Sequence, residues 1–179
     1  MERARQLDRL LRSRGTPFAF MGGLAVNAWS IPAPTYDIDL CADLPEEAVP
    51  ALVRELESEG FAPPPTAWLE SVGRARFREF SVHWPFQDGL IPADFFVALD
   101  EFQMEALGRR RNVELDDGFT TDILAPEDLL VYKLIAWRPK DRAAIERLTM
   151  VQTSLDWDRV RRWARVYGVE DRLQEARGA

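Results

Sequence analysis

The sequence is poor in the residues that bind soft metals or form disulfides. Its 179 residues include one cysteine, Cys41, and one histidine, His83. A single cysteine excludes a disulfide within the chain and fits a reducing compartment, so we expect a cytoplasmic protein. One cysteine and one histidine cannot assemble a zinc site of the usual nitrogen and sulfur ligands within one chain. A bound metal is therefore expected to have oxygen ligands, and both residues are predicted to be structural.

Long apolar runs are also missing. No stretch of about 18 apolar residues occurs, which predicts that the chain does not span a membrane. The opening residues "MERARQLDRLLRSRG" are charged and lack the apolar centre of a signal peptide. With 46% hydrophobic residues, the chain is nevertheless able to bury the core of one domain.

Positive charge is scarce over most of the chain. The net charge of −7 argues against a protein that coats nucleic acid nonspecifically. Residues 1–139 carry a net charge of −9 and residues 140–179 a net charge of +2. One predicted helix of the positive end holds Arg159, Arg161, Arg162 and Arg165. Two interpretations stay open, a solvated helix face and a docking patch for a polyanion.

Hydrophobic periodicity and turn residues predict helices and strands that alternate along the chain. Strands are expected over about 17–21, 36–42, 68–72, 77–84 and 91–99, with a hairpin over 112–124. The hairpin turns are placed near Gly73 and at Asp117-Gly118. Helices are expected over about 1–14, 24–29, 45–59 and 100–107, and from residue 125 onward with breaks near Pro139, Thr153 and Gly168.

These elements predict an α/β or α+β fold with a mixed β-sheet flanked by helices. Residues 1–125 are expected to form the core. Residues 126–179 are expected to form a helical C-terminal part that packs on it as a single compact unit.

Three aspartates are the main candidates for chemistry. In "YDIDL", Asp37 and Asp39 are two residues apart, so a strand would direct both carboxylates to one face. Asp94 lies in the apolar run "IPADFFVAL", where a carboxylate is costly unless it is paired or binds a metal. If the two strands are neighbours, the three carboxylates meet and suit Mg²⁺, and two such ions support nucleotidyl transfer. The alternative makes them exposed strand-end and turn residues.

Glycines and lysines supply the second set of candidates. Gly22 and Gly23 stand between a predicted strand and a helix, where backbone N–H groups could hold phosphate or simply form a tight turn. Only two of the 23 basic residues are lysines, Lys133 and Lys140, and both lie in "KLIAWRPKD". Lys133 falls on the apolar face of its helix. It either extends its amine to water or delivers a charge to a phosphate.

In their order along the chain, "FMGGLAVNAW", "PTYDIDL", "ADFFVAL" and "APEDLLVYKLIAWRPKDRAAIERL" resemble the AbiEii-type nucleotidyltransferases of the DNA polymerase β superfamily. Many of that group belong to type IV toxin–antitoxin systems. The resemblance covers about residues 18–148 and implies a polymerase β-like nucleotidyltransferase fold. It implies nucleotide binding by Gly22, Gly23, Lys133, Lys140 and Asp141, and Mg²⁺ binding and catalysis by Asp37, Asp39 and Asp94.

The resemblance implies Mg²⁺-dependent transfer of NMP from an NTP to a hydroxyl of RNA, such as tRNA, or of a protein, and an antitoxin as a partner. Two positions depart from the family. Ala33 stands where relatives often have arginine, and Ala144 where they have an acidic residue. These departures leave open a degenerate protein that binds nucleotide or a partner without catalysis. The acidic body leaves open a nucleotidyltransferase that modifies a small molecule.

Overall fold

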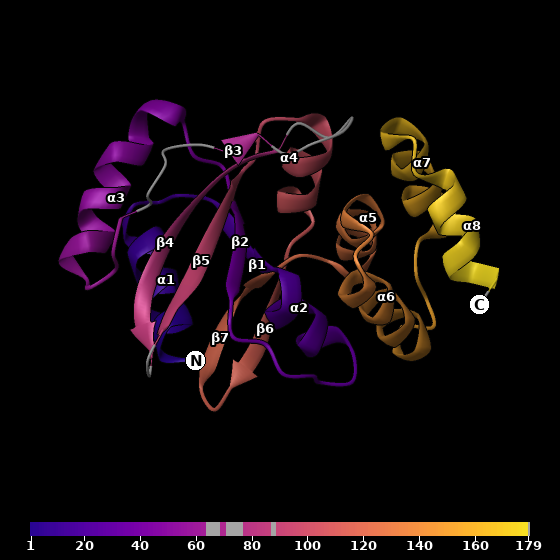
Figure 1. Cartoon of the computed structure of the whole chain (residues 1–179), viewed down its shortest axis with the longest axis horizontal. Coiled ribbons are helices and arrows are strands. Elements are labelled where there is room, and N and C mark those ends of the chain that lie inside the picture. The colour runs from indigo at the N-terminus through magenta and orange to yellow at the C-terminus, as the bar shows by residue number, and fades with distance from the viewer. Residues whose placement is uncertain (64–68, 71–76, 87–88, 179) are drawn as a thin grey trace.

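The computed structural model describes residues 1–63, 69–70, 77–86 and 89–178 (Figure 1). Its strands are β1 (Phe18–Met21), β2 (Ile38–Ala42), β3 (Leu69–Glu70), β4 (Arg78–Phe86), β5 (Gly89–Val97), β6 (Arg111–Asp116) and β7 (Phe119–Ile123). Its helices are α1 (Glu2–Ser13), α2 (Gly22–Trp29), the 3₁₀ turn η1 (Glu46–Ala48), α3 (Val49–Ser58), α4 (Glu101–Gly108), α5 (Pro126–Ala136), α6 (Pro139–Val151), α7 (Trp157–Tyr167) and α8 (Glu170–Gly178).

The strands form one mixed sheet in the order β3-β4-β5-β2-β1-β7-β6. β2 pairs in parallel with β5 and antiparallel with β1 at the centre, and β4–β5 and β6–β7 are antiparallel hairpins. The predicted mixed sheet is therefore confirmed. The predicted turn near Gly73 lies outside the described residues.

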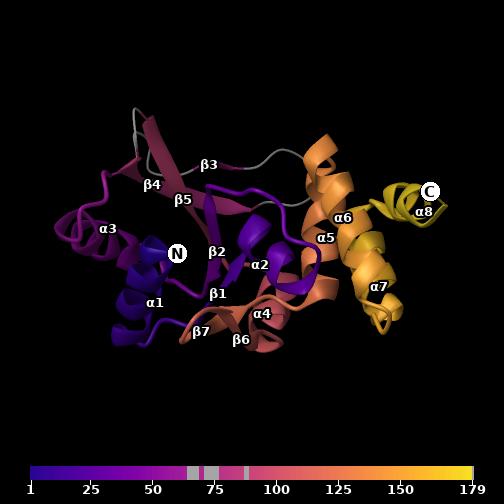
Figure 2. The same ribbon diagram turned by 90° about the horizontal axis from the view of Figure 1, so that it is seen from below.

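Helices cover both faces of the sheet. Figures 1 and 2 show α1 and α3 on one side, and α2 with α5 and the helices after it on the other. The buried leucines of α1 and α3 recur every four residues, as an amphipathic helix requires: Leu7 and Leu11, Leu52 and Leu56. No helix in the described part of the chain is long and apolar enough to cross a membrane.

Local signals in the sequence explain where several helices begin and end. Asp100 caps α4 through a capping box with Gln103, and Asp156 caps α7 by accepting a hydrogen bond from the backbone of Arg159. Gly168 ends α7 in the left-handed conformation that glycine adopts without strain. The predicted helix boundaries in this region are confirmed to within a residue or two.

Cys41 and His83 lie in the sheet, as expected. Cys41 is buried in β2, and burial raises the pKa of its thiol to about 12, so the thiolate nucleophile is disfavoured. His83 lies in β4, where its backbone exchanges hydrogen bonds with Ala62.

The arginines of α7 are engaged in ion pairs with acidic side chains. Arg159 binds Glu105 and Asp128, and the other three bind partners on α4, α7 and α8: Arg161 with Asp158, Arg162 with Glu101 and Glu105, Arg165 with Glu170. The helix therefore presents arginines whose charge is largely compensated, which favours the solvated-face interpretation over a polyanion patch.

We expect Arg159→Ala to lower the free energy of unfolding by about 3 kcal/mol, because it leaves the buried Asp128 carboxylate without its closest cation. Arg159 holds Asp128 at 2.7 Å, and burial already raises the pKa of that carboxyl despite the arginine. Arg161→Ala on the same helix breaks only an exposed pair and should cost under about 1 kcal/mol. Urea unfolding of both variants measures the difference, and equal losses would contradict the assignment.

Candidate active site

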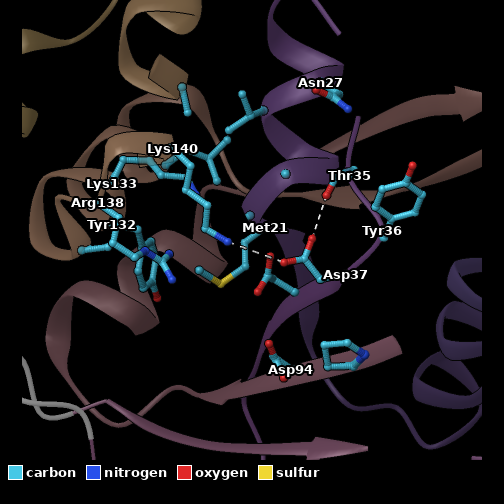
Figure 3. A pocket seen from close by; sticks show the side chains of 18 of the residues that line it. Met21, Asn27, Thr35, Tyr36, Asp37, Asp94, Tyr132, Lys133, Arg138 and Lys140 are labelled. Atoms are coloured by element: carbon cyan, nitrogen blue, oxygen red, sulfur yellow. Dashed lines mark hydrogen bonds and ion pairs between the residues drawn. The ribbon is translucent and has the colours of Figure 1, made fainter. Parts of the chain in front are cut away.

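A pocket of about 1180 Å³ opens between the sheet, α2 and the α5–α6 turn (Figure 3). One side is lined by residues 33–37, which belong to the segment 30–37, called here the strap. Asn27 of α2 fixes the strap, because its side chain exchanges hydrogen bonds with the backbone N–H and carbonyl of Ala33 at 3.0 and 2.7 Å. Seven of the eight predicted site residues line the pocket: Gly22, Gly23, Asp37, Asp39, Asp94, Lys133 and Lys140.

The parallel pairing of β2 and β5 places Asp39 directly beside Asp94. Side chains of directly paired residues point to the same face of a sheet, so both carboxylates face the pocket. Asp94 accepts a hydrogen bond from Ser81, its antiparallel partner on β4. The condition on which the three carboxylates were expected to meet, that these two strands are neighbours, is therefore met.

Asp37 corrects one expectation from the sequence. β2 begins at Ile38, so Asp37 lies at the end of the strap rather than within the strand. It accepts a hydrogen bond from Thr35 at 2.8 Å, and one of its oxygens lies 3.8 Å from Lys140 Nζ (Figure 3). The ladder between β2 and β5 begins at the pair Ile38–Ala93, so Asp37 precedes the first described pair of this strand.

The three carboxylates repel one another across the pocket. Burial, and then the charges of Asp37 and Asp94, raise the pKa of Asp39 from its ordinary value of 3.8 to about 6, while Lys133 and Lys140 act in the opposite direction. Within the described ranges no three acidic, histidine or cysteine side chains are already arranged around a metal position. The donors are nonetheless all oxygens, and a divalent cation would relieve their repulsion, so the residues fit Mg²⁺.

Glycine is required at position 22 for two separate reasons. Gly22 has a φ of +59°, and a Cβ built there would lie 1.7 Å from Asp39 Oδ2. At Gly23, a Cβ would lie 2.4 Å from Thr35 Oγ1. Because both residues lack a side chain, the start of α2 can approach Asp39 and the strap closely. A tight turn alone would not require glycine for such an approach.

Lys133 and Asp141 form the other wall. Asp141 is fully buried and lies behind the pocket lining, where it binds Lys133 Nζ at 3.0 Å and Arg138 Nε at 2.7 Å. Burial acts to raise the pKa of Asp141, but the hydrogen bonds and charges of Arg138 and Lys133 prevail and lower it. The predicted nucleotide contact from Asp141 is thus indirect in this arrangement, since Asp141 positions the two cations.

A strained residue sets the direction of this wall. Trp137, between α5 and α6, has a φ of +53° and is the single non-glycine residue with positive φ in the described chain. A bulky residue in the left-handed region costs about 1–3 kcal/mol and persists where the surrounding structure imposes it. The turn at Trp137 brings Arg138 and Lys140 back to the pocket beside Lys133.

Three charged lining residues were not predicted from the sequence: Arg138, Glu79 and Arg147. Glu79 lies on β4, two residues before Ser81 and so on the same face. Burial, then the charge of Asp94, raises the pKa of Glu79, and Arg138 lowers it. Arg147 continues a helical stripe with Lys140, Ala143 and Ala144, and its buried Nε has no hydrogen-bond partner in the described structure. In the sequence, Glu79 is two residues from Ser81 on one strand, and Arg147 is seven residues from Lys140 on one helix. Neither spacing shows which face of the strand or helix lines the pocket.

Solved structures identify the fold, although no family model and no curated protein matches the sequence. The lincosamide antibiotic adenylyltransferase LnuA, with lincomycin bound, has a TM-score of 0.55 at 12% identity, covering 84% of this chain and 97% of that one. The antibiotic-resistance factor ANT(2'')-Ia has a TM-score of 0.55 at 18% identity, covering 95% and 91%. A candidate nucleotidyltransferase from Thermotoga maritima has a TM-score of 0.53 at 16% identity, covering 84% and 92%. The chain therefore has the nucleotidyltransferase fold that the resemblance implied.

We expect Gly22→Ala to destabilise the protein by roughly 3 kcal/mol, because it adds a clash with the Asp39 carboxylate to the cost of a positive φ. The matched control is Gly118→Ala in the β6–β7 turn, where φ is +65° and no atom lies within 4 Å of the added Cβ. That variant should lose only the conformational part, about 1 kcal/mol. Chemical denaturation compares the two, and a Gly118→Ala loss as large as that of Gly22→Ala would contradict the close approach.

We expect Asp39→Asn to stabilise the metal-free protein, by about 1–3 kcal/mol at pH 7.5. The folded-state pKa of Asp39 is raised, so ionisation disfavours the fold, and the penalty grows as pH rises from about 4 through 6. The advantage of the variant should therefore be small at pH 4 and complete above pH 7. Thermal unfolding in EDTA across this pH range checks it, with Asp171→Asn on the exposed face of α8 as the control. An advantage that shrinks as pH rises would contradict the electrostatics.

Proposed function

We propose that this protein is a Mg²⁺-dependent nucleotidyltransferase that moves NMP from an NTP to an acceptor hydroxyl. The observation that carries the proposal is the direct pairing of Asp39 with Asp94 in a pocket that also contains Gly22-Gly23 and four cations of the α5–α6 wall. Structural likeness to nucleotidyltransferases supports the same reaction class.

The NTP would occupy the half of the pocket between α2, the strap and α6. Backbone N–H groups at the start of α2 and the cations Lys133, Arg138 and Lys140 suit a triphosphate. The small side chains of Ala143 and Ala144 leave room beside the strap for the nucleoside, and Arg147 supplies an unpartnered donor there. Arg147 thereby supplies a cation to the pocket, where relatives often have an arginine at the position of Ala33.

In the chemical step, the acceptor oxygen forms a bond to the α-phosphorus of the NTP. The bond from that phosphorus to the oxygen bridging to the β-phosphate breaks, and pyrophosphate leaves. The acceptor proton passes to the carboxylate of Asp94, which lies beside Asp39 at the centre of the pocket. Most of the acceleration would come from positioning and from stabilising the charge on the phosphates.

Asp37, Asp39 and Asp94 would hold Mg²⁺, whose chemistry when bound is to neutralise phosphate charge and lower the pKa of the attacking hydroxyl. To bind the ion, Asp37 would give up its contact with Lys140. The long, exposed side chain of Lys140 would then turn to the phosphates. Lys133 would keep its place through Asp141. The order of the glycine, aspartate and lysine motifs along the chain also supports a relationship to the AbiEii-type enzymes. If that relationship holds, a toxin role with an antitoxin partner follows from it.

A second candidate is a degenerate protein that binds nucleotide without transfer, which the departures at Ala33 and Ala144 favour. Both alanines lie in the pocket wall without disturbing it, since the Ala33 backbone is bound to Asn27 and Ala144 is packed in the core. The three carboxylates proposed for catalysis all line the pocket, which supports transfer over binding alone.

We expect Asp39→Asn and Asp94→Asn each to lower NMP transfer by at least about 100-fold while the fold is retained, since each removes a charged group at the reacting centre. The assay supplies each of the four α-labelled NTPs with Mg²⁺, together with tRNA, cell lysate or small hydroxylated acceptors. Asp171→Asn, remote from the pocket, should keep wild-type activity.

The outcomes separate the two candidates. Label transfer that depends on Asp39 supports the enzyme. A rise in melting temperature with NTP and Mg²⁺, without pyrophosphate release from any acceptor mixture, supports the degenerate protein. Neither transfer nor NTP-dependent stabilisation would contradict both.

A further inference from the structure

The two walls of the pocket differ in charge. The wall formed by α5 and α6 contributes the cations, namely Lys133, Arg138, Lys140 and Arg147. The opposite wall, formed by β4 and β5, contributes no cation from the described residues, but carries Glu79 and Asp94 among apolar side chains. A triphosphate is drawn to the first wall, so the second wall is left for the acceptor.

The side chain of Glu79 makes no hydrogen bond and no ion pair with the described residues, and only the charge of Arg138 acts on it favourably. Asp37 contacts Lys140, Asp94 contacts Ser81, and Asp141 contacts two cations. Asp39 also has no such contact in the described structure, but it is the residue proposed to hold the metal. Arg138, the cation whose charge acts on Glu79, is itself bound by Asp141 at 2.7 Å. A half-buried carboxylate without a partner is a site where a ligand cation is favoured.

The register fixes how far Glu79 lies from the reacting centre. Ser81 is directly opposite Asp94, so Glu79 is the diagonal neighbour of Asp94 across the β4–β5 pair. Diagonal neighbours on one face have Cα atoms about 7–8 Å apart. One small molecule can therefore place a hydroxyl at Asp94 and a cationic group at Glu79.

The rest of this wall is apolar. Phe77, Leu90, Pro92 and Phe96 line it, and Leu90 is 62% exposed at the rim. Carbon-rich surface beside one carboxylate is suited to an amphiphilic ligand whose ring or chain packs on the wall while its cation meets the charge.

We propose that Glu79 is a specificity residue for the acceptor, and that the acceptor is a small hydroxylated amine, such as an amino sugar or aminocyclitol, with its ammonium group at Glu79 and its reacting hydroxyl at Asp94. This inference rests on the proposed nucleotidyl transfer. It selects the small-molecule acceptor over RNA, because an RNA backbone would place phosphates against Glu79 and Asp94. The four clustered arginines of α7, all ion-paired, offer no free patch to hold it.

The test compares each amine with its neutral counterpart: glucosamine with N-acetylglucosamine, and streptamine with its diacetylated form. In wild-type protein, kcat/KM with α-labelled NTP should be higher for the amines. Glu79→Gln should lower kcat/KM for the amines at least about tenfold, with the KM for NTP unchanged, since hydrogen bonds to charged groups are worth about that much. Glu79→Asp should retain part of the preference, and Glu57→Gln on α3, outside the pocket lining, should match wild type.

Several results would overturn the inference. One is an equal effect of Glu79→Gln on amines and acetylated counterparts. Another is transfer to tRNA or to lysate protein alone, unaffected by Glu79→Gln. If no acceptor is labelled, calorimetry of the amines decides without nucleotide chemistry. Binding that weakens in Glu79→Gln supports the acceptor site while the proposed transfer fails, and binding that is absent or independent of Glu79 contradicts the site itself.

Discussion

The parallel pairing of β2 with β5 is the constraint on which the rest of the site depends. It sets Asp39 beside Asp94 and, through the β4–β5 hairpin, sets Ser81 and Glu79 on the same face. A shift of one residue in either register would turn these side chains to the opposite face of the sheet. The apolar residues that alternate with them, such as Leu40 and Phe95, are fully buried and therefore oppose such a shift. Core packing thus holds the carboxylates in place.

The site accumulates features that reduce stability. The carboxylates of Asp37, Asp39 and Asp94 share one pocket and repel one another. Trp137 adopts a left-handed backbone conformation, and Gly22 leaves the start of α2 without a side chain. Each is unfavourable for the isolated fold and favourable for binding a charged ligand. The compensating interactions lie in the surroundings, where Asp141 joins α5 to α6 through Lys133 and Arg138, and Asp128 joins α5 to α7 through Arg159.

Charge is segregated within a single pocket rather than between domains. The cations come from α5, α6 and the turn between them, whereas the carboxylates come from the end of the strap and from β2, β4 and β5. A protein with a net charge of −7 can therefore still present a local positive wall to a nucleotide. The same segregation gives the two proposed substrates separate halves of the pocket, with the reacting atoms meeting at Asp39 and Asp94.

The sequence by itself determined the elements and most of the candidate residues. Turn glycines, prolines and apolar periodicity located the helices and strands of the described chain. The aspartates, glycines and lysines were recognisable because they are costly or rare where they occur. The sequence could not place Asp37 outside β2, because strand ends depend on which backbone groups find partners in the sheet. Nor could it show that Lys133 binds Asp141, or that Glu79 and Arg147 line the pocket. Those facts were decided by the tertiary structure, since strand order and helix packing bring together residues whose separation along the chain carries no signal of contact.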